Sequence, residues 1–119
     1  MSLTDKALDM CLELGRILAQ TEEFKKMKDA EQNLMRDTEA RKLVEDLQML
    51  QAEHRRIQLS GQQLSEDDKK KAKEVEAVAM NHPAVKASFQ ANADFQAMMN
   101  KITSKIKEGI RENSRQASH

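Results

Sequence analysis

The sequence predicts an all-α protein: a helical bundle of about four to five helices, two of them long, that assembles as an oligomer. Three observations lead to this prediction. Good helix formers such as Ala, Leu, Met, Glu, Lys and Gln dominate the composition. Breakers and strand formers are rare, since the 119 residues include three glycines, one proline, three phenylalanines and no tryptophan or tyrosine. Apolar residues also recur at helical spacing along most of the chain.

The first helix is expected to begin near Thr4 or Asp5, which are good N-caps, and to end at about Gln20. Its apolar stripe comprises Ala7, Leu8, Met10, Cys11, Leu14, Ile17 and Leu18. Cys11 lies in this stripe with no cysteine or histidine nearby, so a buried core thiol is favoured over a reactive or metal-binding cysteine. Thr21 is expected to cap the second helix, "EEFKKMKDAEQNLM", whose leading glutamates suit the positive end of the helix dipole.

The third helix has the clearest pattern and is expected to be capped by Asp37 or Thr38. Its residues at heptad a and d spacing predict lengthwise packing on another helix, and they are Ala40, Leu43, Leu47, Leu50, His54 and Ile57. Leu64 extends this register if the helix continues past Gly61. His54 is favoured as a ring that lines the seam, and a catalytic or metal-binding histidine is the alternative.

"LSGQQLSEDDKK" is the best loop candidate, because Gly61 suits a helix end and Ser65 suits the next helix start. Asp68 occupies the capping-box position three residues after Ser65. The lysines at 69–71 are favoured as a solvated helix face over a phosphate-binding patch.

Pro83, the chain's one proline, is expected at the first position of the last helix, where its missing N–H has no helical partner anyway. Asn81 is the expected C-cap of the preceding helix. The last helix is expected to run to about Glu112, and residues 113–119 form a frayed tail. Residues 1–112 are expected to form a single helical domain.

The seams of the third and last helices are longer than one small protomer is expected to bury, which predicts a homodimer or higher oligomer. The predicted oligomer or partner interface consists of Leu43, Leu47, Leu50, Ile57, Phe89, Phe95, Met99, Ile102 and Ile106.

Charge and hydropathy argue against some classes of function. Twenty basic residues balance twenty acidic ones, whereas dedicated nucleic-acid binders usually carry a basic excess. Contact with RNA phosphates through Lys107, Arg111 and Arg115 stays open as an alternative. No apolar run reaches transmembrane length, and the N-terminus is unlike a signal peptide, so a cytoplasmic protein is expected.

Motifs for catalysis or cofactors are not found. The sequence lacks GxxxxGK, GxGxxG and GxSxG, and its three histidines have no HExxH or CxxC spacing. We expect no catalytic site, metal or other cofactor.

The order of segments resembles the YlbF/YmcA family, most closely its YheA-type branch, over roughly residues 4–110. The segments that carry the resemblance are "TEEFKKMKDAEQNLMRDTEARKLVEDLQMLQ", "LSGQQLSEDD" and "NHPAVKASFQANADFQAMMNKITSKI". Within them lie the helix starts at Glu22, Glu23 and Phe24 and at Asp37, Glu39 and Ala40, the loop before Leu64 and Ser65, and the Asn-His-Pro entry.

The resemblance implies an all-helical, oligomeric fold. It also implies a regulatory role, because some members of the family are subunits of a complex that promotes competence, sporulation and biofilm formation. That complex acts partly by helping an endoribonuclease mature messenger RNAs. Members of that complex hold an iron–sulfur cluster on C-terminal cysteines, but this chain ends "KEGIRENSRQASH" and its one cysteine is Cys11. We therefore expect a non-catalytic regulatory or scaffold protein that binds itself and cytoplasmic protein partners, without a cluster. An RNA-processing accessory factor is the alternative.

Overall fold

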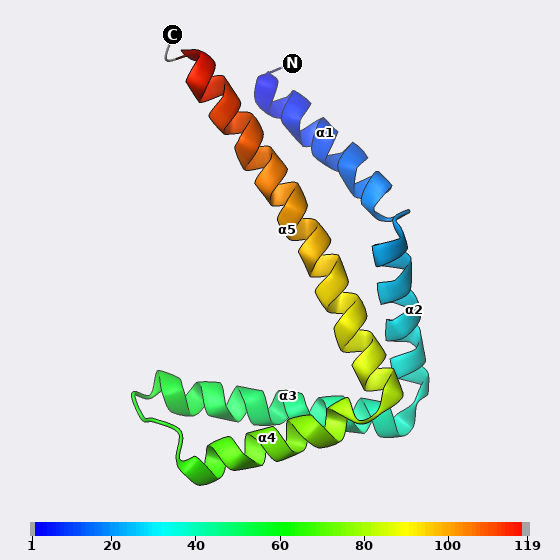
Figure 1. Ribbon diagram of the computed structural model, residues 1–119, viewed down its shortest axis with the longest axis vertical. Coiled ribbons are helices and arrows are strands. Elements are labelled where there is room, and N and C mark those ends of the chain that lie inside the picture. The colour runs from blue at the N-terminus through cyan, green and yellow to red at the C-terminus, as the bar shows by residue number, and fades with distance from the viewer. Residues whose placement is uncertain (1, 118–119) are drawn as a thin grey trace. The chain divides into compact units, whose positions relative to one another are not determined.

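The computed structural model describes the backbone of residues 2–117 and the side chains of residues 2–114. Within this range the chain forms five α-helices and no strand: α1 Leu3–Leu18, α2 Glu22–Arg36, α3 Thr38–Leu59, α4 Glu66–Met80 and α5 Pro83–Ala117 (Figure 1). The predicted all-α fold is confirmed. The predicted assembly into an oligomer stays a prediction.

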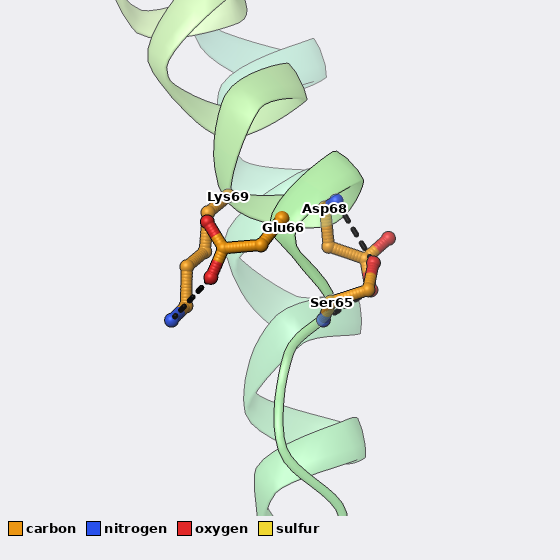
Figure 2. A network of polar contacts seen from close by, with 4 residues as sticks. All are labelled: Ser65, Glu66, Asp68 and Lys69. Carbon is orange, nitrogen blue, oxygen red and sulfur yellow. Dashed lines mark hydrogen bonds and ion pairs between the residues drawn. The ribbon is translucent and has the colours of Figure 1, made fainter.

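Local side chains explain where most helices begin. Thr21 accepts the N–H of Phe24 at 3.2 Å, and Asp37 accepts the N–H of Ala40 at 2.9 Å. The α4 start has the predicted capping box, in which Ser65 accepts the Asp68 N–H at 3.1 Å and its own N–H donates to the Asp68 carboxylate at 3.3 Å (Figure 2).

Two predicted helix ends were wrong by a few residues. The first helix is capped by Ser2, in a second capping box with Asp5, rather than by Thr4 or Asp5. The two capping boxes share the Ser-x-x-Asp spacing. The box of Ser2 and Asp5 lies so close to the start of the chain that no apolar pattern precedes it to indicate a helix boundary. The last helix passes Glu112 and continues through residues 113–117, because nothing in this polar segment breaks a helix.

The contacts divide the chain into two compact units, which are described separately. Unit 1 comprises residues 1–28 and 91–119, and unit 2 comprises residues 29–90. A single domain over residues 1–112 stays a prediction.

Unit 2 contains the larger part of the core, formed where α3 packs against α4 and the start of α5. Ala40, Ala79 and Val85 are fully buried and Leu47 is 5% exposed. Alanines at these positions let the helix backbones approach closely. Gly61 has φ +86°, so it turns the chain after α3 in a conformation that other residues rarely adopt.

The junction before α5 has the predicted form. Asn81 is the C-cap of α4, and α5 begins at Pro83. The proline is exposed, and the next free N–H, that of Ala84, donates to Nδ1 of His82 at 3.1 Å. The break between α4 and α5 is therefore capped on both sides.

Unit 1 has little core. Ala91 is the one buried residue among its described side chains. The rings of Phe24 and Phe95 are 6.0 Å apart and tilted by 58°, and the Lys28 ammonium lies 5.7 Å from the centre of the Phe24 ring. The rest of the unit consists of α1 and the long outer part of α5.

The prediction that Cys11 is a buried thiol was wrong, because the structure exposes it. No residue of α1 is buried. The periodicity identified the apolar residues of this helix, but among them only Leu14 and Leu18 are half-buried and the others are exposed.

Candidate protein-binding surface

Both units expose large apolar side chains, and seven of the twelve among the described residues belong to unit 1. All seven are at least 55% exposed; apart from Leu3, the first residue of α1, they define what we call the unit 1 apolar face: Leu8, Met10, Leu12, Ile17, Ile106 and Ile110. Burying one such side chain is worth roughly 1.5–3 kcal/mol. These side chains lie on α5 and on more than one side of α1, and large apolar side chains that stay exposed often mark sites of protein association.

A groove of about 450 Å³ lies within this unit. Its apolar wall comprises Leu14 of α1 and Met98, Ile102 and Ile106 of α5, and Lys101 and Lys105 line it as well. The groove is thus largely apolar, with two lysines in its lining, of which Lys105 pairs with Glu108 at 3.1 Å. A groove of this kind suits the apolar stripe of an amphipathic helix.

A smaller groove of about 220 Å³ lies in unit 2 between α3 and α4. Leu43, Val75 and Val78 give it an apolar lining, and Asp46 and Glu74 make its edge acidic. Val78 is 57% exposed. Elsewhere on these two helices, Ala40, Leu47, Leu50 and Ala79 are buried, whereas Met49 and Leu59 are 71% and 82% exposed.

The predicted interface residues fall into three groups. Leu47 and Leu50 are 5% and 9% exposed, so packing within the chain already covers them. Half-buried positions come next, and they are Leu43, Ile57, Phe95, Met99 and Ile102. Phe89 and Ile106 are exposed, at 42% and 55%. Of the nine predicted residues, these two are the most accessible to a partner.

The sequence reasoning did not anticipate that most apolar side chains of α1 are exposed. The signal was present, because Leu8 and Leu12 lie on a different side of the helix from Leu14 and Leu18. A helix that packs against one neighbour needs only one stripe. Apolar residues on more than one side indicate more than one neighbour.

The predicted phosphate contacts lie farther along α5. Lys107 and Arg111 are exposed, and the Arg115 side chain lies outside the described side chains. A carboxylate interrupts this basic surface, since Glu108 forms an ion pair with Lys105 at 3.1 Å. The RNA alternative stays a prediction.

A further groove of about 340 Å³ in unit 1 has mixed charge and comprises Glu22, Glu23, Lys26, Ala91, Asp94, Ala97, Met98 and Lys101. Residues 2–117 contain no group of three or more His, Cys, Asp or Glu side chains placed to hold a metal ion. His54, which the sequence placed on the α3 seam, is half-buried. In the same part of the chain, no helix is long and apolar enough to cross a bilayer.

The fold matches solved structures. A protein of unknown function (DUF964) from Bacillus stearothermophilus superposes with a TM-score of 0.79 at 15% identity, covering 87% of this chain and 91% of that one. Bacillus subtilis RicA, solved in complex with RicF, gives a TM-score of 0.71 at 14% identity, covering 91% of this chain and 96% of that one.

Sequence comparison identifies relatives that match most of the chain. A UPF0342 protein of Levilactobacillus brevis is 27% identical over 110 residues, which cover 92% of this chain and 96% of the relative. A UPF0342 protein of Alkalihalophilus pseudofirmus is 26% identical over 104 residues, covering 87% and 88%. The profile of the family described as "Control of competence regulator ComK, YlbF/YmcA" matches residues 7–111. The chain therefore belongs to the YlbF/YmcA family.

Proposed function

We propose that this chain is a non-catalytic regulatory protein of the cytoplasm that acts by binding other proteins, including copies of itself, through the unit 1 apolar face. The observation that carries the proposal is the exposure of six large apolar side chains on a unit with one buried residue among its described side chains. Association with another protein removes such surface from water.

The comparisons support the regulatory part of the proposal. The family description names control of the competence regulator ComK, and the structural relative RicA was solved in complex with RicF. By analogy, this chain assembles with proteins that act in the regulation of competence, sporulation or biofilm formation. The UPF0342 and YlbF/YmcA names carry no enzymatic activity.

The experiment compares tagged proteins purified from native cells. One variant places charges on the unit 1 apolar face, Ile106→Glu with Ile110→Glu. The matched control places the same charges on exposed apolar residues of unit 2, Met49→Glu with Leu59→Glu, which are 71% and 82% exposed in the parent chain. We expect the first variant to lose co-purified protein, its own untagged copies included, by about 10-fold or more.

The control should retain its partners at the level of the parent chain. Equal loss from both variants, or full retention by the Ile106→Glu/Ile110→Glu variant, would contradict the proposal.

A further inference from the structure

Helix α1 has apolar side chains on two sides of the ridge formed by the half-buried residues Leu14 and Leu18. At 3.6 residues per turn, Leu8 and Leu12 lie about 120° from that ridge in one direction, and Met10 and Ile17 about 70° in the other. Leu8 and Leu12 are 60% and 61% exposed. The ridge lies toward the groove along α5, so the Leu8–Leu12 side of α1 faces away from it.

The charged residues beside Leu8 and Leu12 are placed so that those of one copy can pair with those of a second copy. Asp5 lies near the beginning of α1 and Arg16 near its end, and both border this side of the helix. When two copies of α1 pack antiparallel about a twofold axis, Asp5 of each copy lies opposite Arg16 of the other. The same arrangement places Leu8 of one copy beside Leu12 of the other, twice over, as an isologous interface requires.

We propose that the Leu8–Leu12 side of α1 is a self-association surface, whose partner is α1 of a second copy packed antiparallel. The inference rests on the proposed function and names one occupant for part of the unit 1 apolar face. Within the chain, Arg16 pairs with Glu13 at 3.1 Å, and their side chains are 68% and 66% exposed. Exposed pairs of this kind are weak, so Arg16 is able to exchange Glu13 for Asp5 of the second copy.

The packing also makes Gly15 useful, since it lies on the same side of α1 and a Cβ there would meet nothing within 4 Å. Its missing side chain lets the second helix approach closely. With its own α5 on one side and α1 of the second copy on the other, α1 becomes an interior helix of the dimer.

In the proposed antiparallel α1 pair, the position of Cys11 allows the pairing to be tested by crosslinking. It is exposed and is the only cysteine of the chain. The twofold axis passes between Met10 and Cys11, so the two Cys11 thiols lie near the axis on the same side of the interface. A short bismaleimide should therefore join two parent chains into a covalent dimer at tens of micromolar protein.

The first control moves the thiol to the opposite side of the helix. In the Cys11→Ser/Glu13→Cys variant, we expect at least about 10-fold less covalent dimer, since position 13 faces away from the partner. Equal yields from both chains would mean random collision and would overturn the inference.

The second comparison tests whether self-association depends on the Leu8–Leu12 side of α1. Leu8→Glu with Leu12→Glu should abolish the covalent dimer and weaken self-association by about 10-fold or more in sedimentation equilibrium. Met49→Glu with Leu59→Glu makes the same kind of change on exposed residues of unit 2 and should leave the covalent dimer intact. The reverse pattern, or a parent chain that gives no covalent dimer, would overturn the α1 pairing. The proposed function is tested separately, by the purification of the Ile106→Glu/Ile110→Glu variant.

Discussion

The His82 imidazole connects the beginnings of two helices, because its Nε2 lies 3.3 Å from Oδ2 of Asp37, the N-cap of α3. Its Nδ1 accepts the N–H of Ala84 in the first turn of α5. A nitrogen that accepts an N–H carries no proton of its own, so a neutral ring holds its proton on Nε2, the nitrogen that lies next to the Asp37 carboxylate. One side chain thus caps α5 and anchors it to the cap of α3.

Removing this contact should destabilise unit 2. Asp37→Ala removes the cap of α3 and the acceptor for His82, so we expect a loss of about 1–2 kcal/mol in the free energy of unfolding, measured with urea. Ser65→Ala removes a helix cap without a histidine partner and should cost about 1 kcal/mol.

A double-mutant cycle of Asp37→Ala with His82→Ala should give a coupling energy of about 0.5–1 kcal/mol. Additive single changes would show that the contact adds nothing to the two caps.

Pro83→Ala should change little. The alanine gains freedom in the unfolded chain, which costs up to about 1 kcal/mol. His82 is then free to become helical, but fusing α4 with α5 would remove Val85 from the core, where it is fully buried. Unfolding and sedimentation should therefore show a small loss of stability and an unchanged oligomeric state. A loss of several kcal/mol, or a new oligomer size, would show that the proline alone maintains the break.

Leu47→Asp and Ile106→Asp separate folding from binding. Leu47 is 5% exposed, so a charge there should cost at least about 3 kcal/mol of stability. Ile106 is 55% exposed, so the same charge should cost less than about 1 kcal/mol in the protein without partners, while it weakens association. Thermal melting and co-purification of both variants measure the two effects. Similar melting curves would mean that the core is misassigned.

Gly61→Ala tests the turn between α3 and α4. A Cβ at this position meets nothing within 4 Å, so its cost comes from the φ of +86° alone. We expect a loss of about 1–2 kcal/mol in urea unfolding. Gly109→Ala adds a methyl group in equally open space but inside α5, and it should stabilise the protein by up to about 1 kcal/mol. A neutral Gly61→Ala would show that the loop relaxes without strain.

Most of the fold was predictable because its helix boundaries depend on local chemistry. Thr21, Asp37, Ser65 and Pro83 each satisfy or avoid a backbone N–H within a few residues, so the sequence alone identifies them. The surface was harder to predict. The apolar spacing of Leu47 and Leu50 is of the same kind as that of Ile102 and Ile106, yet only the first pair is buried. Periodicity identifies the apolar side of a helix, whereas its neighbours depend on contacts between distant segments, and for this reason Cys11 was misplaced.

The most direct test of the central claim, that the unit 1 apolar face binds protein, is photocrosslinking in native cells. A photoreactive phenylalanine derivative would replace Ile106 in one strain and Met49 of unit 2 in another. Both parent residues are exposed, at 55% and 71%. We predict discrete protein adducts from position 106, with adducts at least about 10-fold weaker from position 49. No adduct from position 106, or equal adducts from both positions, would contradict the claim.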